Sequence, residues 1–208
     1  MLSSSAPGYP TGPAVFIVIY ILGVLVGSTI RYHYTRAYRK HIREKGKRPG
    51  VDTRLLYLPF LGMVVLPAIY ILTSWLSVAD YTLPMWAGWA GTVIYAGAFV
   101  LLWRSHADLG GAFSPVTEIT EGQKLVTDGV YRSIRHPMYA AHFLWGLAQP
   151  FLLWNWVAGF SMLATFLPLY MVRVAKEEDA MEAAFGDDYR AYMRRTGRII
   201  PRHFRRQD

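Results

Sequence analysis

The sequence predicts an all-α integral membrane protein, a helical bundle of about five transmembrane helices. Of its 208 residues, 53% are hydrophobic and only 17% are charged, a more apolar composition than soluble domains of this size have. The apolar residues fall in a few long blocks and do not follow the 3.6-residue period of a soluble helix. We expect one integrated domain, with an N-terminal three-span region, 1–104, and a C-terminal region, 105–208.

The first two apolar blocks predict two membrane spans. Block 13–30 follows a start that is rich in Ser, Gly and Pro and has no basic residue, unlike a cleavable signal peptide, so we expect it to be retained. Its roughly 18 residues just cross a hydrocarbon core of about 30 Å. Block 55–79 contains Pro59 and Pro67. These predict kinks and not helix ends, because neighbouring helices in a bundle can satisfy the freed carbonyls.

Three further apolar blocks complete the predicted bundle. Block 84–103 carries Gly88 and Gly91, small residues that let another helix approach closely. Blocks 137–153 and 156–175 are separated by a short break. They predict a helical hairpin made of a shorter fourth span and a longer fifth span.

Two polar segments adjoin these last spans. The connection 104–136 is too long for a mere link between helices, and long loops favour a functional interpretation. The tail from Lys176 onward is charged, and its Phe185, Tyr189 and Tyr192 recur at i, i+4 and i+7. That spacing places the three rings on one helix face and predicts a C-terminal amphipathic helix that folds back on the bundle.

The basic residues predict the topology. All 22 lysine and arginine residues lie in three segments, 31–54, 104–135 and 173–208. With five spans, these three segments share one side of the membrane, and the positive-inside rule makes that side cytoplasmic. The N-terminus is then outside and the C-terminus cytoplasmic.

Composition also excludes several classes of site. The chain has no cysteine, so disulfides, thiolate metal ligands and cysteine nucleophiles are excluded. We attribute the net charge of +8 to loops on the anionic cytoplasmic leaflet and expect no nucleic-acid partner. His136 and His142 lack an acidic residue at i+3 or i+4, so we expect no metal. The glycines match no dinucleotide or phosphate-loop spacing, so we expect no Rossmann domain.

Polar residues of candidate function gather on the basic side. Arg173 and Glu177 lie four residues apart on one helix face, a spacing equally typical of a simple ion pair and of a site in which the carboxylate binds an ammonium and the guanidinium an anion. His136 precedes Pro137 at a helix start, where a histidine more often caps or lines an interface than acts as a base. Spacing alone leaves these alternatives open.

The motifs together resemble a known family. They occur in the strings GQKLVTDGVYRSIRHPMYAA and RVAKEEDAMEAAFGDDYRAYMRRTGRIIP, on either side of the apolar hairpin. Over about residues 105–201 the sequence is similar to the isoprenylcysteine carboxyl methyltransferase family, including its small prokaryotic members. The motifs that match in order and spacing are Leu125-Val126, Gly129-Val130-Tyr131, Arg135 to Tyr139, Glu177-Glu178, and Phe185-Gly186 with Tyr189 and Tyr192.

The resemblance implies an S-adenosylmethionine site that is built from the long loop and the last two spans. It implies that Arg173 is the catalytic residue that anchors the substrate and that Glu177 holds the α-ammonium of the cofactor. The remaining implied cofactor contacts are Gln123, Lys124, Leu125, Val126, Tyr131, His136, Pro137, Met138 and Tyr139.

The implied reaction is methyl transfer to a lipid-like or prenylated small-molecule acceptor, such as the carboxylate of an isoprenylated cysteine. An ionised carboxylate needs no general base, so Arg173 would only orient one oxygen toward the methyl group. The acceptor would enter from the bilayer, the cofactor would enter from the cytoplasm, and the N-terminal three spans would shape the acceptor tunnel.

Other functions remain open from sequence. A phospholipid N-methyltransferase would need a proton acceptor near the amine, and His136 or Glu178 could serve. A small-thiol methyltransferase would share the cofactor, and a sterol-reductase-like enzyme would use a nicotinamide cofactor. A non-catalytic or transport protein would be expected to show paired repeats or ionisable residues within its spans. His142 is the clear exception to the apolar character of these spans.

The expected partners are the acceptor and membrane lipids. A bacterial source would place the chain in the inner membrane, and a eukaryotic source would place it in the endoplasmic reticulum. The candidate site faces the cytoplasm in either case. The sequence does not determine the oligomeric state.

Overall fold

Helices account for most of the described chain, as the sequence predicts. The computed structural model describes residues 13–44, 57–110 and 124–202, and within these ranges it shows no strand, only two isolated bridges. The elements are α1 (Ala14–Glu44), α2 (Tyr57–Phe60), the π-helical turn η2 (Leu61–Val65), α3 (Leu66–Leu72), the 3-10 turn η3 (Ser77–Ala79), α4 (Met85–Leu109), the 3-10 turn η5 (Gly129–Arg132), α5 (Pro137–Leu153) and α6 (Trp156–Arg195).

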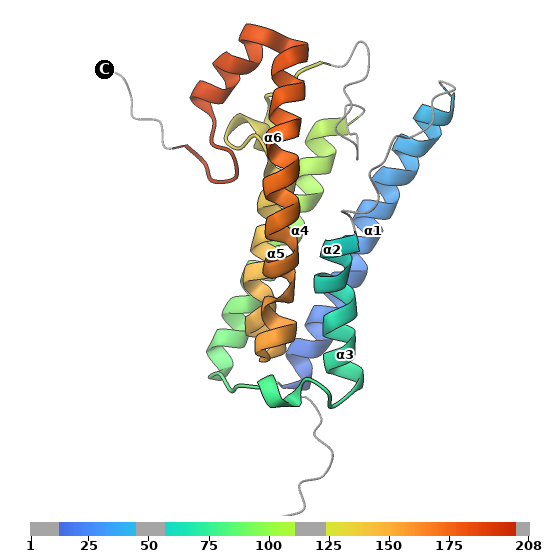
Figure 1. The fold of residues 1–208 in the computed structure, drawn as a ribbon, viewed down its shortest axis with the longest axis vertical. Coiled ribbons are helices and arrows are strands. Elements are labelled where there is room, and N and C mark those ends of the chain that lie inside the picture. The colour runs from blue at the N-terminus through green and yellow to red at the C-terminus, as the bar shows by residue number, and fades with distance from the viewer. Residues whose placement is uncertain (1–12, 45–56, 111–123, 203–208) are drawn as a thin grey trace, which may run out of the picture.

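The long elements run alternately in opposite directions along one axis. Figure 1 shows α1, the α2–η2–α3 unit, α4, α5 and α6 following one another up and down the molecule. Among the described residues, three helices are long and apolar enough to cross a membrane by length and composition, namely Ala14–Arg36 within α1, α4 and α6. Tyr57–Leu72 is a shorter apolar helix, and α5 has 17 residues. The membrane class therefore holds, while the count of five spans stays a prediction.

The helices differ from the predicted spans at their ends. Helix α1 continues past Ile30 to Glu44, because 31–44 contains no proline or glycine to end it. The second span, predicted to reach Ala79, ends instead at Leu72. There Thr73 is extended, and both its backbone N–H, at 3.0 Å, and its hydroxyl, at 2.6 Å, donate to the Ile69 carbonyl and close the last turn.

The predicted kink at Pro67 is present and its freed carbonyls have partners. Proline has no N–H to donate to the carbonyl four or five residues earlier, which here belongs to Met63 or Gly62. The Tyr20 hydroxyl of α1 donates to the Met63 carbonyl at 2.6 Å. The Ser161 hydroxyl of α6 donates to the Gly62 carbonyl at 2.6 Å. The π-helical turn thus connects α1 and α6 at a depth where, in a membrane, water would not replace these bonds.

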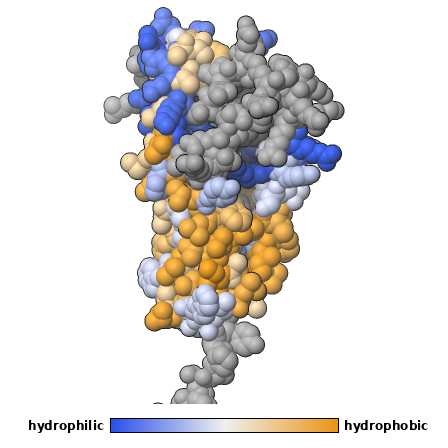
Figure 2. All heavy atoms as spheres, turned by 45° about the vertical axis from the view of Figure 1, so that its right-hand side comes forward, coloured by the Kyte–Doolittle hydropathy of each residue, from blue (hydrophilic) through white to orange (hydrophobic). Residues whose placement is uncertain are grey.

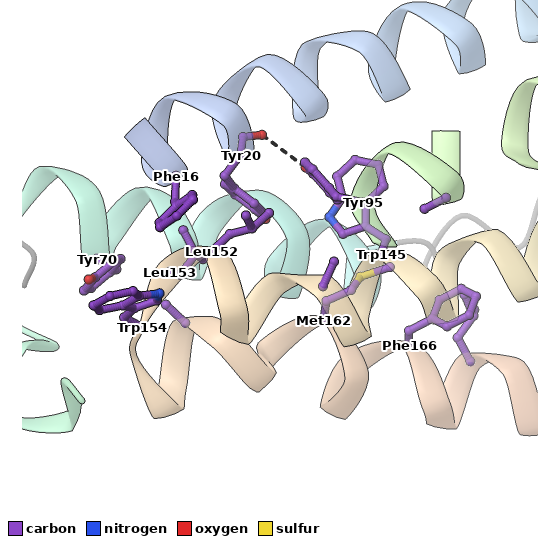
Figure 3. Packing of buried hydrophobic residues seen from close by; sticks show 14 residues of the cluster. Phe16, Tyr20, Tyr70, Tyr95, Trp145, Leu152, Leu153, Trp154, Met162 and Phe166 are labelled. Carbon is purple, nitrogen blue, oxygen red and sulfur yellow. Dashed lines mark hydrogen bonds between the residues drawn. The ribbon is translucent and has the colours of Figure 1, made fainter. Parts of the chain in front are cut away.

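Aromatic side chains fill the centre of the bundle. Tyr95 of α4 donates its hydroxyl to the Tyr20 carbonyl at 3.1 Å and packs edge-on against Trp145 of α5 (Figure 3). A Cβ at Gly88 would lie 2.1 Å from the Phe16 ring, and one at Gly91 would lie 2.4 Å from Phe151 Cβ. The predicted packing role of these two glycines is confirmed.

The surface divides into an apolar body and a polar end. Figure 2 shows hydrophobic side chains covering the middle of the face in view, with hydrophilic side chains gathered above them. Exposed large apolar residues on the three long helices include Val18, Leu25, Val93, Val100 and Met171. Water would not favour such a band, whereas lipid tails would.

We predict that Gly62→Ala destabilises the protein and that Gly97→Ala does not. A Cβ at Gly62 would lie 2.1 Å from Thr165 Oγ1 and 2.4 Å from the Ser161 carbonyl oxygen, whereas one at Gly97 meets nothing within 4 Å. The first change should lower the free energy of unfolding by about 1–3 kcal/mol. Tryptophan fluorescence during heating in detergent measures both variants, and equal midpoints would contradict the packing described here.

Candidate active site at the polar end of the bundle

The loop before α5 is anchored to α4 through two side chains. The Val130 N–H donates to Asp108 Oδ2 at 2.8 Å. Gly129 has φ of 61° and leaves no room for a Cβ, which would lie 2.1 Å from the same oxygen. The Tyr131 hydroxyl donates to the Ser105 carbonyl at 3.2 Å. Burial, with the nearby Tyr192 and Asp108, raises the pKa of Tyr131, so this side chain is a neutral structural contact.

The C-terminal segment returns to the same loop. Helix α6 changes direction at Gly186, which has φ of 52° and ψ of −126°, a conformation that favours glycine. Beyond it Tyr189 and Tyr192 are buried, and the Tyr192 hydroxyl donates to the Tyr131 carbonyl at 2.7 Å. A membrane-surface role for this last stretch of helix stays a prediction.

Backbone hydrogen bonds then pair the loop with residues 197 and 198. The Arg135 N–H donates to the Gly197 carbonyl at 2.8 Å, and the His136 N–H donates to the Arg198 carbonyl at 2.9 Å. The Gly197 N–H donates to the Ser133 carbonyl at 3.2 Å. This short parallel pairing places the Arg135 and Arg198 side chains on the same acidic residue of α6.

That acidic residue is Glu178, which is buried. Its Oε1 accepts from Arg135 Nε and from Arg198 Nε, both at 3.1 Å, and lies 3.2 Å from His136 Nε2. Its Oε2 accepts from Arg198 Nη2. Arg135 also donates to the Met193 and Thr196 carbonyls. We call Glu178, Arg135, Arg198 and His136 the Glu178 cluster.

The cluster keeps Glu178 ionised. Burial alone raises the pKa of Glu178, but hydrogen bonds from His136 and Arg198 and the charge of Arg135 outweigh it and lower the pKa to about 2. A carboxylate with so low a pKa is a poor proton acceptor.

Glu177 faces a different set of partners. Its Oε1 accepts from the Tyr139 hydroxyl at 2.7 Å and lies 3.2 Å from Arg173 Nη2. Its Oε2 is 3.8 Å from His136 Nδ1, beyond hydrogen-bond distance. Glu177 is half-buried, with 22% of its side chain exposed. One oxygen therefore has strong partners and the other keeps capacity to accept.

An aromatic wall of α5 and α6 adjoins Glu177. The Tyr139 ring lies 5.4 Å from Tyr170 and 5.9 Å from Phe166. The His142 ring stacks on Phe166 at 5.1 Å. Because this wall is apolar and next to a carboxylate, it suits a ligand that has both a flat ring and an ammonium group.

The structure brings together four of the predicted site residues, namely His136, Tyr139, Arg173 and Glu177. The others serve elsewhere or lie further off. Pro137 is buried and begins α5. The sequence predicted this helix start. The Met138 carbonyl lies 2.7 Å from His142 Nδ1. Lys124, Leu125 and Val126 are described but do not belong to the Glu177 contacts above, and Gln123 lies outside the described residues.

Two arginines near the site were not assigned a role from sequence. Arg198 lies 20 residues after Glu178 and meets it only because the chain folds back at Gly186. Arg31 lies on α1, and its Nη1 is 3.2 Å from His142 Nε2. Basic residues are common outside the membrane spans of any membrane protein, so nothing in the sequence predicted a site role for either arginine.

Organic cations fit these residues better than a metal ion does. Within the described ranges, no three His, Cys, Asp or Glu side chains could hold a metal. Glu177 offers a carboxylate oxygen for an ammonium, and Tyr139 and Tyr170 offer ring faces. The cofactor roles of individual residues stay predictions.

Part of the chain is similar in sequence to a known family. Residues 89–183 match the isoprenylcysteine carboxyl methyltransferase (ICMT) family. This range contains the Glu177 contacts and ends before Phe185, Tyr189 and Tyr192. The match confirms the family resemblance predicted from the motifs.

Individual relatives match over shorter stretches. The protein-S-isoprenylcysteine O-methyltransferase of Schizosaccharomyces pombe is 35% identical over 77 residues, which is 37% of this chain and 33% of the relative. The human protein of that name is 32% identical over 84 residues, which is 40% of this chain and 30% of the human protein. Protein-S-isoprenylcysteine O-methyltransferase B of Arabidopsis thaliana is 29% identical over 94 residues, which is 44% of this chain and 48% of the plant protein. The chain thus matches less than half the length of each.

We predict that Glu178→Gln destabilises the protein and flattens its response to acid. The variant leaves Arg135 without its buried counter-charge, a loss on the order of 3 kcal/mol. The folded pKa of Glu178, about 2, is below the ordinary value of 4.5. The wild-type stabilisation is therefore complete above about pH 5 and is lost as the pH falls toward 2.

Thermal midpoints in detergent between pH 7 and pH 3 measure this effect. The wild type should lose more stability than Glu178→Gln over that range. Glu182→Gln is the matched control, because Glu182 pairs with exposed Arg190 on the same helix and such pairs contribute little. A Glu178→Gln midpoint equal to that of the control at pH 7 would contradict the role of the cluster.

Proposed function

We propose that this relative of the isoprenylcysteine carboxyl methyltransferases is an S-adenosylmethionine-dependent methyltransferase that acts in the membrane on a lipid-like carboxylate, such as that of an isoprenylated cysteine. The observation that carries the proposal is the half-buried Glu177, with one oxygen engaged by Tyr139 and Arg173 and the other open to a donor. The family match over 89–183 supports the same reaction class.

The residues around Glu177 suit this cofactor. The open oxygen of Glu177 would accept a hydrogen bond from the α-ammonium, and the wall of Tyr139, Phe166 and Tyr170 would cover an apolar or aromatic part of the molecule. When bound, S-adenosylmethionine supplies an electrophilic methyl group on a sulfonium. Glu177 then binds and orients, and it has no proton to move.

Arg173 would orient the acceptor. It is next to Glu177 at 3.2 Å and lies one helical turn beyond Tyr170. An ammonium on Glu177 would compete for that carboxylate and leave Arg173 available to an acceptor carboxylate. Because the nucleophile is already ionised, the protein needs only to align its oxygen and exclude water.

The contacts of Glu178 support a carboxylate acceptor over the amine of the phospholipid N-methyltransferase alternative. A neutral amine becomes positively charged during transfer, so a proton acceptor is needed close to it. Glu178, one of the two residues that could serve, has a pKa of about 2 and is held by Arg135 and Arg198. The neighbouring arginines would also repel an ammonium acceptor.

We further propose five membrane spans with the polar end on the cytoplasmic side and the N-terminus outside. In Figure 1 the C-terminal ends of α1, α4 and α6 and the start of α5 lie at one end of the bundle. The described basic residues outside the apolar stretches gather there, as the positive-inside rule requires of a cytoplasmic face. S-adenosylmethionine would enter the site from the cytoplasm, and the acceptor would enter it from the bilayer.

We predict that Glu177→Ala and Arg173→Ala separate binding from turnover. Glu177→Ala should weaken S-adenosylhomocysteine binding by at least about tenfold, roughly 1.4 kcal/mol, because the ammonium loses its carboxylate. Arg173→Ala should keep binding within about threefold of the wild type and abolish methylation of an S-farnesylcysteine. Calorimetry on detergent-purified protein and a methylation assay measure the two effects.

Lys176→Ala is the matched control, since Lys176 is an exposed neighbour of Glu177 on the same helix. It should leave binding and turnover unchanged. If a folded wild type bound no S-adenosylhomocysteine, the methyltransferase proposal would fail. If both site variants lost binding equally, the division of roles would be wrong.

A further inference from the structure

Helix α1 brings one more cation to this end of the bundle. Arg31 Nη1 donates to His142 Nε2 at 3.2 Å, a contact between residues 111 positions apart in sequence. Arg31 is an exposed residue, and the contact with His142 engages one of its five N–H donors. Arg31 lies outside the range that matches the family.

The contact with Arg31 sets the proton positions on His142. A guanidinium has donors and no acceptor, so Nε2 of His142 must present its lone pair. Nδ1 then carries the proton and donates to the Met138 carbonyl at 2.7 Å. His142 is therefore neutral, and the Arg31 charge receives no compensation from it.

The charge of Arg31 is also uncompensated by acidic side chains. Among the described residues, no Asp or Glu lies within ion-pair distance of Arg31. The charge of another cation, Arg173, acts on Arg31, and the His142 ring that accepts from Arg31 stacks on Phe166 of α6, the helix that carries Arg173. Two guanidinium groups that repel each other near the end of an apolar helix favour an anion that both can reach.

We propose that Arg31 is a second binding residue for the acceptor, and that Arg31 and Arg173 together hold its carboxylate between α1 and α6. His142 positions Arg31 by taking one of its donors. The guanidinium keeps its remaining donors for the ligand. The assignment rests on the proposed methyltransferase function and adds to it a residue from the N-terminal region.

Two cations also account for acceptor choice. A carboxylate shared by two guanidinium groups forms an ion pair with each, whereas a carboxamide of the same shape accepts hydrogen bonds without the attraction between opposite charges. A neutral or cationic headgroup would leave the Arg31 guanidinium without a counter-charge. The two arginines thus discriminate between acceptors by headgroup charge. The lipid-like part of the acceptor adds affinity but does not discriminate between headgroups.

The test uses Arg31→Gln, because the glutamine amide can still donate toward His142 while the charge is removed. The acceptor is N-acetyl-S-farnesylcysteine, and its carboxamide serves as a competitive inhibitor. We expect Arg31→Gln to raise KM for the carboxylate at least about tenfold. The kcat, the inhibition constant of the carboxamide and the affinity for S-adenosylhomocysteine should stay within about threefold of the wild type. Arg31→Lys should recover part of the lost affinity.

Arg36→Gln, an exposed position further along α1, is the matched control and should behave as the wild type. An unchanged KM in Arg31→Gln, with cofactor binding intact, would overturn this inference alone. Equal losses for carboxylate and carboxamide would assign Arg31 a purely structural role and also overturn it. Failure of the wild type to bind S-adenosylhomocysteine would instead contradict the proposed function.

Discussion

Glu178 joins three parts of the chain that meet at the polar end of the bundle. Its carboxylate accepts from Arg135 in the loop before α5 and from Arg198 after the turn at Gly186, and it contacts His136 at the start of α5. Because Glu177 directly precedes Glu178 on α6, fixing Glu178 inward also fixes the direction of Glu177. The geometry of the candidate site therefore depends on the Glu178 cluster, which adjoins it through His136.

Across the bundle, polar side chains that stabilise the fold differ from those that could bind a ligand. Polar side chains deep in the apolar body satisfy carbonyls that Pro67 leaves free, as Tyr20 and Ser161 do. At the polar end, by contrast, Glu177 and Arg31 keep donors or acceptors that the described protein does not use fully. Spare hydrogen-bonding capacity beside an apolar wall is what a ligand site requires, and at the basic end the open oxygen of Glu177 adjoins the aromatic wall of Tyr139 and Tyr170.

Sequence patterns predicted the all-α membrane class, the Pro67 kink, the helix start at Pro137 and the close packing at Gly88 and Gly91, because each depends on local chemistry. They also named Tyr139, Arg173 and Glu177, which one short stretch of α5 and α6 brings together. They did not predict the end of α3 at Leu72, because the apolar block continues past the residue, Thr73, where the backbone becomes extended. Nor did they assign roles to Arg198 and Arg31, because the contacts of both residues arise from tertiary folding over long sequence separations.

A structure determined with S-adenosylhomocysteine bound tests the central claim most directly. We predict that the amino group of the ligand lies within hydrogen-bond distance, about 3 Å, of a Glu177 carboxylate oxygen, with Glu178 still held by Arg135 and Arg198. Arg173 should have moved away from Glu177. A ligand found elsewhere on the chain, or an amino group held by another residue while Glu177 keeps its present partners, would contradict the account.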